Sequence, residues 1–250
     1  IVPYRVFPPV MGGQKGIAVF YRYLARMLHL SVITVSDSQP EESFQVYTQL
    51  GRSRLRYINP FLLVRVWRMA RHEKATHLLF EHPYYAWMIL LFRCFSSYTL
   101  ILHAHNIECE RFRSVGKKWW PLLKAYEGLA FRMTHIHWFK TNADRDYAIT
   151  QFNIHTDSCT LIPYGTSIEK LPAPDTCQQA RQQMLQAFGG DASTCILLFN
   201  GTLSYRPNAE ALEFILSDIH PRLQAMGFNY RIVICGKDLP DYLQAWCVRE

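Results

Sequence analysis

The sequence predicts an α/β protein built on parallel sheets, and three observations carry this prediction. Short apolar runs recur along the 250 residues, and they lack the alternation of apolar and polar residues that a sheet with one face in water shows. Segments with helical periodicity separate these runs. The same strand-helix pattern starts afresh late in the chain, after a segment rich in proline and glycine. Apolar strands separated by helices are typical of parallel sheets that are covered on both faces.

The apolar runs that we interpret as strands span residues 31–35, 77–80, 98–102, 136–139, 159–162, 195–199 and 230–234. The most hydrophobic stretch covers residues 84–102, and Arg93 and the pair Ser96–Ser97 interrupt it. On either side of Arg93 it is too short to cross a bilayer. We therefore interpret it as a buried helix followed by a buried strand.

Helices are predicted where apolar residues recur at the spacing of one helix face. The clearest sets are Ile17, Phe20, Tyr21, Leu24 and Leu28, then Leu212, Ile215, Leu216, Ile219 and Leu223, with a weaker set at Leu122, Tyr126, Ala130 and Met133.

Two domains are expected, with a linker between them. The segment 166–193 contains Pro172, Pro174, the pair Gly189–Gly190 and a short Gln-rich helical stretch. We assign residues 1–165 to the first domain, 166–193 to the linker and 194–250 to the beginning of a second domain. The second holds about two strands, too little for a core of its own.

Composition narrows the class of protein. The chain is 49% hydrophobic and 19% charged, which is too apolar for disorder. Its net charge of +7 favours an anionic partner such as a nucleotide, a phospholipid surface or nucleic acid, although a basic excess is also a common route to solubility. The scattered cysteines form no CxxC pair, which argues against a zinc ribbon or a disulfide scaffold and favours a reducing, cytoplasmic setting.

Glycine-containing turns recur where strands lead into helices. They are "FPPVMGGQKG" at 7–16, "LIPYG" at 161–165 and "FNGTLSYRPN" at 199–208. Each one alone is compatible with an ordinary turn. Glycine also lets the backbone approach a ligand, and a following helix N-terminus with a nearby cation suits a phosphate.

The order of these motifs resembles the family 4 glycosyltransferases, retaining nucleotide-sugar enzymes of the GT-B architecture. The matching segments are "PPVMGG", "LILHAHN", "LIPYG", "FNGTLSYRPNAEALEF" and "IVICG". The resemblance covers nearly the whole chain. It implies two Rossmann-like domains facing a cleft, the second only partly present.

The resemblance also implies roles for individual residues. Gly12 and Gly13 match the glycine loop that approaches the donor's phosphates, and His105 matches the family's pocket histidine, which contacts the transferred sugar. Gly165 matches the glycine of "IPxG". Gly201 and Arg206 lie in the family's diphosphate-binding loop, but Thr202 stands where an arginine commonly follows the glycine, which leaves Arg206 as the cation.

The implied activity is the transfer of a hexose-like sugar from a UDP- or GDP-sugar to a glycan or lipid-linked acceptor, with retention of configuration. No metal and no cofactor other than the donor substrate is expected, and no nucleic-acid partner. Such an enzyme would serve cell-envelope polysaccharide biosynthesis in the cytoplasm. The family's two-glutamate motif lies downstream of "IVICG" and is not reached by Glu250. We therefore expect a truncated sequence, and an isolated 250-residue chain that is inactive.

Residues 103–113, "HAHNIECERFR", concentrate polar groups after an apolar run. We expect His103 and His105 to point to opposite faces of their strand, which would prevent joint metal binding, and His103 to pack against a helix or bond to backbone. Asn106, Glu108 and Arg111 are candidate acceptor contacts, in a loop that extends through Glu110 and Arg113.

Two basic segments suit contact with an anionic membrane surface. Arg65, Arg68, Arg71 and His72 lie opposite an apolar helix face, and residues 111–124 place cations beside Trp119 and Trp120. A solvated face with the tryptophans in the core is the simpler explanation of both segments. Two other readings of the whole chain stay open: another GT-B nucleotide-sugar enzyme such as an epimerase, and a non-catalytic protein that binds anionic ligands or nucleic acid.

Overall fold

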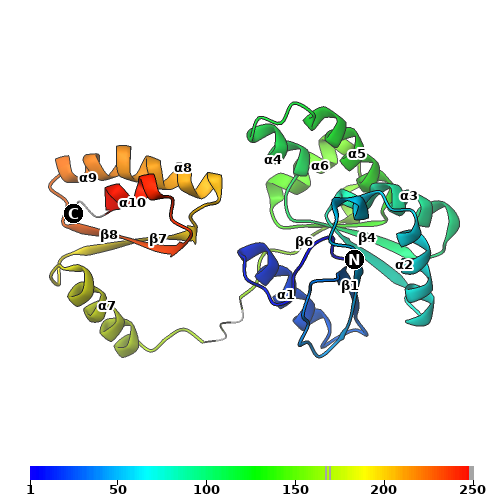
Figure 1. The fold of residues 1–250 in the computed structure, drawn as a ribbon, viewed down its shortest axis with the longest axis horizontal. Helices are drawn as coiled ribbons and strands as arrows, with labels where there is room; N and C mark the ends of the chain where they lie inside the picture. Colours follow the sequence, from blue (N-terminus) through cyan, green and yellow to red (C-terminus); the bar gives the residue numbers. More distant parts are fainter. Residues whose placement is uncertain (167, 169, 248–250) are drawn as a thin grey trace. The chain divides into compact units, whose positions relative to one another are not determined.

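The protein is described by a computed structural model that covers residues 1–166, 168 and 170–247. The chain forms two compact units, Ile1–Ser167 and Ile168–Glu250 (Figure 1). All strand pairs among the described residues are parallel. The expected linker contains helix α7 (Pro174–Phe188), which belongs to the second unit.

The first unit alternates strands and helices, as the apolar runs predict. Its strands are β1 (Ser31–Val35), β2 (Gln45–Leu50), β3 (His77–Glu81), β4 (Thr99–Ala104), β5 (Ile136–Phe139) and β6 (Cys159–Leu161). Its α-helices are α1 (Gly12–Leu24), α2 (Phe61–His72), α3 (Ala86–Phe95), α4 (Glu108–Ser114), α5 (Trp120–Met133) and α6 (Asn142–Phe152). Short 3-10 turns are η1 (Arg54–Tyr57), η2 (Pro83–Tyr85) and η3 (Thr156–Ser158).

Backbone hydrogen bonds from the first two residues link the sheet β1–β2 to the sheet β3–β4–β5–β6. The Val2 amide donates to the Ile33 carbonyl at 2.9 Å, and the Glu81 amide donates to the Ile1 carbonyl at 3.0 Å. The lateral order is therefore β2, β1, Ile1–Val2, β3, β4, β5, β6. The winding direction reverses between Ile1–Val2 and β3, which is the switch point where open parallel sheets bind ligands at the carboxyl ends of their strands.

The core of this unit lies between the central strands and the helices that cover them. Leu100 and Leu102 of β4 and Phe92 of α3 are fully buried. The most hydrophobic stretch of the sequence is thus a buried helix and a buried strand, as predicted. In the described part of the chain, no helix has both the length and the apolarity that crossing a membrane requires.

Helix α2 shows the amphipathic pattern that the sequence predicts. Leu62, Val66 and Ala70 are buried on one side of the helix. Arg65, Arg68 and Arg71 are exposed on the other side. The basic face of this helix is therefore accessible to solvent.

The second unit has two paired strands, β7 (Cys195–Thr202) and β8 (Tyr230–Lys237). In Figure 1, α8 (Arg206–Phe214), α9 (His220–Ala225) and α10 (Asp241–Cys247) lie over one face of these strands, and the π-helical turn η4 (Ile215–Ile219) joins the first two. Leu203, Leu212 and Leu243 are buried there and form a small core.

Candidate functional site

Polar side chains gather at the carboxyl ends of the strands of the first unit. Glu81 is the last residue of β3, His105 follows β4 directly, and Lys140 follows β5 directly. Tyr164 comes shortly after β6, and its hydroxyl lies 3.3 Å from His105 Nδ1. The cluster therefore lies where a doubly wound sheet places its ligand-binding groups.

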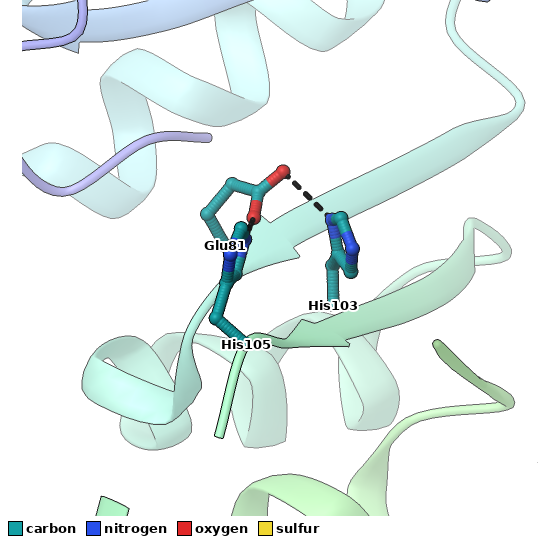
Figure 2. Close-up of side chains that lie close together, drawn as sticks. All are labelled: Glu81, His103 and His105. Atoms are coloured by element: carbon teal, nitrogen blue, oxygen red, sulfur yellow. Dashed lines mark hydrogen bonds and ion pairs between the residues drawn. The ribbon is translucent and has the colours of Figure 1, made fainter. Parts of the chain in front are cut away.

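Glu81 holds two histidines with its two carboxylate oxygens (Figure 2). Its Oε1 is 3.0 Å from His103 Nδ1, and its Oε2 is 2.6 Å from His105 Nε2. The rings of the two histidines are only 4.6 Å apart. The prediction that they point to opposite faces is wrong, because residues two apart on a strand share a face.

The carboxylate also fixes which ring nitrogens carry hydrogen. A carboxylate only accepts, so the facing nitrogens donate: Nδ1 of His103 and Nε2 of His105. The His105 Nδ1 then keeps its lone pair, which accepts from the Tyr164 hydroxyl. The second nitrogen of His103, Nε2, is buried with no hydrogen-bond partner among the described residues. The His103 ring packs against Phe20 of α1, with ring centroids 5.1 Å apart.

Burial sets the charge state of this group. Desolvation lowers the pKa of His105 to about 4, although the hydrogen bond and charge of Glu81 oppose the shift. Burial by itself would raise the pKa of Glu81, but the charge and hydrogen bonds of His103 and His105 hold it well below the usual range. His105 is therefore a neutral imidazole near pH 7, anchored on a carboxylate.

The donor set of Glu81, His103 and His105 is that of a His₂Glu metal site, with its ligand atoms within 4.8 Å of one another. Ligand atoms at 2.0–2.1 Å from one tetrahedral ion would be roughly 3.3 Å apart. The 2.6 and 3.0 Å separations are instead hydrogen-bond distances. We therefore describe the group as a hydrogen-bonded network, and the expectation of a metal-free site stays a prediction.

His82 extends this network to Glu108 and Arg111. Its Nδ1 is 3.0 Å from a Glu108 oxygen, and its Nε2 is 2.8 Å from the Tyr4 hydroxyl. Arg111 donates from Nε to the other Glu108 oxygen at 2.9 Å. His82 has φ 64° and ψ 161°, a backbone region that only glycine adopts readily. Strained residues of this kind concentrate at functional sites.

Residues 108–113 form the helix α4, not the predicted loop. Both carboxylate oxygens of Glu127 accept the amides of Glu108 and Cys109 at 2.8 Å. These bonds satisfy two of the free amides at the start of the helix, and the apolar Ile107 before it is buried.

The three candidate acceptor residues differ in exposure. Glu108 is buried, and His82 and Arg111 together hold its pKa below normal against the effect of burial. The Arg111 side chain is 37% exposed and so reaches solvent. Asn106 is half-buried, and its Oδ1 has no hydrogen-bond partner within the described residues. The Arg111 side chain is thus more available to a ligand than Glu108, whereas the Asn106 oxygen is buried.

Lys140 places a buried cation in the same cluster. Its ammonium nitrogen lies 4.8 Å from the ring centroid of Tyr164 and 5.5 Å from that of Phe20. Burial lowers the pKa of Lys140, and the charge of Glu81 opposes this shift. A partly desolvated ammonium beside aromatic rings is suited to an anionic group of a ligand.

Gly12, Gly13 and Gly165 have no packing reason to be glycine. A Cβ at any of them would meet no atom within 4 Å among the described residues, and none has a positive φ. At Gly16, one turn into α1, a Cβ would lie 2.7 Å from the Tyr164 ring, so the ring would have to shift. Helix α1 therefore packs beside Tyr164, and its first residues leave open space.

Gly201 and Arg206 belong to the second unit. A Cβ at Gly201 would lie 2.7 Å from the side chain of Asn208, which donates to the Thr202 carbonyl at 3.0 Å. Packing of the strand-helix turn thus accounts for this glycine. Arg206 begins α8, is 77% exposed, and pairs with Glu210 on its own helix at 2.6 Å.

Sequence patterns did not indicate Tyr4, Glu81, His82, Lys140 and Tyr164 as site residues. A usable signal was present, since Glu81, His82 and Lys140 come directly at the ends of apolar strands, as His105 does. Their meeting depends on strand register, in which Glu81 pairs with His103 across β3 and β4.

The strands, helices and parallel sheets of the first unit define it as a Rossmann-like α/β fold. No protein-family model and no curated protein sequence matches the chain. Among solved structures, a sucrose-phosphate synthase from Thermosynechococcus elongatus is similar, with a TM-score of 0.68 and 12% identity, over 99% of this chain and 67% of that one. A glycosyltransferase from Rickettsia africae has a TM-score of 0.55 and 13% identity, over 95% of this chain and 69% of that one. These similarities show the glycosyltransferase fold and confirm the predicted fold class.

Proposed function

We propose that the protein transfers a sugar from a nucleotide diphosphate sugar to an acceptor, with retention of configuration. The observation that carries the proposal is the neutral His105, fixed by the buried Glu81 at the switch point of the sheet. The glycosyltransferase fold of the similar structures supports it.

His105 is the residue to which we assign contact with the transferred sugar. Its Nε2–H is committed to Glu81, so its orientation is set before any ligand arrives. Its Nδ1 faces the partly exposed Tyr164, whose weak 3.3 Å bond a sugar hydroxyl can replace. Such preorganisation lets the imidazole act without reorganising during the reaction.

The departing diphosphate needs positive charge, and the chain supplies it without a metal ion in this proposal. The open amides at Gly12 and Gly13 begin α1, and a helix N-terminus attracts phosphate. Lys140 adds a cation in the first unit. In the second unit, Gly201 and Arg206 are proposed phosphate contacts on the strength of the sequence resemblance alone. The acceptor hydroxyl then attacks the anomeric carbon on the face from which the diphosphate leaves. The new C–O bond forms as the bond to the diphosphate breaks, and the departing diphosphate takes the hydroxyl proton.

The acceptor is proposed to be a glycan or lipid-linked molecule, with Asn106, Glu108 and Arg111 on the acceptor side and Gly165 near the donor. The exposed arginines of α2 and the segment before α5, where Lys117, Lys118 and Trp119 are exposed, fit peripheral contact with anionic lipid. Co-sedimentation with anionic vesicles tests this contact, and absence of binding at low salt would reject it.

The test of the activity uses the full-length protein, with a panel of UDP- and GDP-sugars. One donor is expected to raise the melting temperature and to be consumed. At a hundred times its Kd, a ligand stabilises the folded state by about 2.7 kcal/mol. If no nucleotide sugar shifts the melting temperature or is consumed, the proposed function is wrong.

A further inference from the structure

An aromatic cavity of about 690 Å³ lies in the first unit, beside the histidine network. Its volume falls in the usual range for small-molecule sites. The aromatic side chains that line it are Tyr4, Tyr57, Tyr84, Trp87, Phe112 and Tyr126. Ile58, which is 71% exposed, completes the lining.

The polar atoms of this lining are already bonded to the protein. The Tyr4 hydroxyl binds His82 at 2.8 Å, and the Tyr126 hydroxyl donates to the Tyr84 carbonyl at 3.2 Å. Trp87 Nε1 donates to the Tyr57 carbonyl at 2.6 Å. The hydroxyls of Tyr57 and Tyr84 accept from Arg56 at 3.0 Å and from Arg111 at 3.3 Å.

These bonds decide what the cavity can recognise. A sugar hydroxyl that faced this lining would find no free polar atom there, and its desolvation would cost free energy. A lining of aromatic rings whose hydroxyl and indole N–H groups already have hydrogen-bond partners favours an apolar ligand instead. The cavity therefore suits a hydrocarbon group rather than a carbohydrate.

The cavity adjoins the candidate site through shared residues. Tyr4 and Tyr84 line it and also contact His82, whose ring stacks on Tyr84 at 5.2 Å. His82 also stacks on His105, with ring centroids 4.7 Å apart. The cavity is thus separated from His105 by the His82 ring.

Positive charge lies close to the cavity. Arg111, which bonds to Tyr84, stacks its guanidinium on Phe112 at 4.4 Å. Phe112 also contacts the half-exposed Trp119 at 4.7 Å, next to the exposed Lys117 and Lys118. Exposed cations beside an apolar opening are complementary to a lipid with an anionic head group.

We propose that this cavity binds the hydrocarbon chain of an anionic lipid-linked acceptor. The role as acceptor rests on the proposed glycosyl transfer, whereas the binding of a hydrocarbon chain does not. Ligand binding is therefore measured without any donor, by calorimetric titration of the 250-residue chain with ethyl, butyl, hexyl and octyl phosphate.

The affinity is expected to rise with each added methylene. Full burial of a methylene is worth about 0.8 kcal/mol, so an open cavity predicts about a two- to fourfold gain for each one. Octyl phosphate is also expected to bind more tightly than octyl glucoside, because of the nearby cations. An affinity that does not depend on chain length, or equal affinities for the two octyl compounds, would overturn the proposal.

A variant at the opening locates the site. Ile58→Glu adds a charge at an exposed position and should leave the melting temperature unchanged. It should reduce the fold-increase in affinity for each added methylene to about one, which means no increase. Met27→Glu is the matched control, since Met27 is 82% exposed and does not line the cavity. An Ile58→Glu chain that keeps the full chain-length dependence would refute the location.

The donor assay on the full-length protein separates this inference from the proposed function. If donors are consumed but alkyl phosphates show no chain-length dependence, the cavity inference fails alone. If the affinity of alkyl phosphates rises with chain length but no donor is consumed, the cavity still binds hydrocarbon chains and its role as an acceptor site is refuted.

Discussion

Replacing Glu81 with glutamine tests whether this residue positions His105. Glutamine keeps the size of the side chain but offers one oxygen and one amide group to two ring nitrogens that both donate. One histidine must then lose its acceptor or move its proton to the other nitrogen. If His105 changes, its Nδ1 becomes a donor and no longer accepts from Tyr164 or from a sugar hydroxyl.

The expected loss of activity and stability in Glu81→Gln follows from the hydrogen bond that is lost. A buried hydrogen bond to a charged group contributes about 1.5–3 kcal/mol. If the transition state needs the present orientation of His105, kcat/KM falls by roughly 10- to 150-fold. The free energy of unfolding is expected to fall by a similar amount, about 1.5–3 kcal/mol.

Two measurements separate positioning from general damage. Nitrogen-15 NMR of the histidine side chains reports which ring nitrogen of His105 carries hydrogen, and donor consumption by the full-length variant reports catalysis. Glu73→Gln is the control, because Glu73 also accepts several bonds, including those from Ser31 and Tyr47 at 2.5 Å, but lies outside the cluster. Unchanged tautomers together with unchanged kcat/KM in Glu81→Gln would refute the positioning role.

Three further predictions concern charge, backbone and donor binding. The pKa of His105 is about 4 when folded, against 6.5 unfolded, so the unfolded state holds more protons between these values, and stability should fall by up to ~3 kcal/mol as pH drops through this window. Urea unfolding from pH 7 to 4.5 checks this, and His105→Gln should flatten the slope; equal slopes would contradict it. Because His82 has φ 64°, His82→Gly should be more stable than His82→Ala by about 1–2 kcal/mol, the reverse of the usual order, and thermal unfolding of both variants decides. Arg206→Ala in the full-length protein should weaken donor binding about tenfold or more with little change in stability, since its exposed pair with Glu210 contributes little. Arg222→Ala, which removes a similar exposed pair with Asp218, is the control, and equal donor affinities of the two variants would argue against the assignment.

Much of the fold could be predicted because buried parallel strands are apolar along their whole length. The run at 98–102 belongs to β4, which is buried nearly throughout. Strand β2 was missed because it lies at the edge of its sheet and is mostly half-exposed, so its sequence "QVYTQL" contains no apolar run. Strands of this kind are recognised by their pairing rather than by their composition.

The site could be predicted only in part, because its residues come from separate strands. The position of His105 after an apolar run indicated a ligand-binding residue. Its partner Glu81 lies 24 residues earlier and meets it only through the parallel register of β3 and β4. Helix α4 was read as a loop since its N-terminal cap, Glu127, lies 19 residues away in the chain.

The most direct test of the proposed transfer is phosphorus-31 NMR of the full-length protein with its preferred UDP- or GDP-sugar and an acceptor. We expect free nucleoside diphosphate to accumulate with the wild-type protein, and much more slowly with His105→Ala at equal folded concentration. No release from any donor would contradict the proposed glycosyl transfer. Equal release by the wild type and His105→Ala would contradict the assignment of His105 to the transferred sugar.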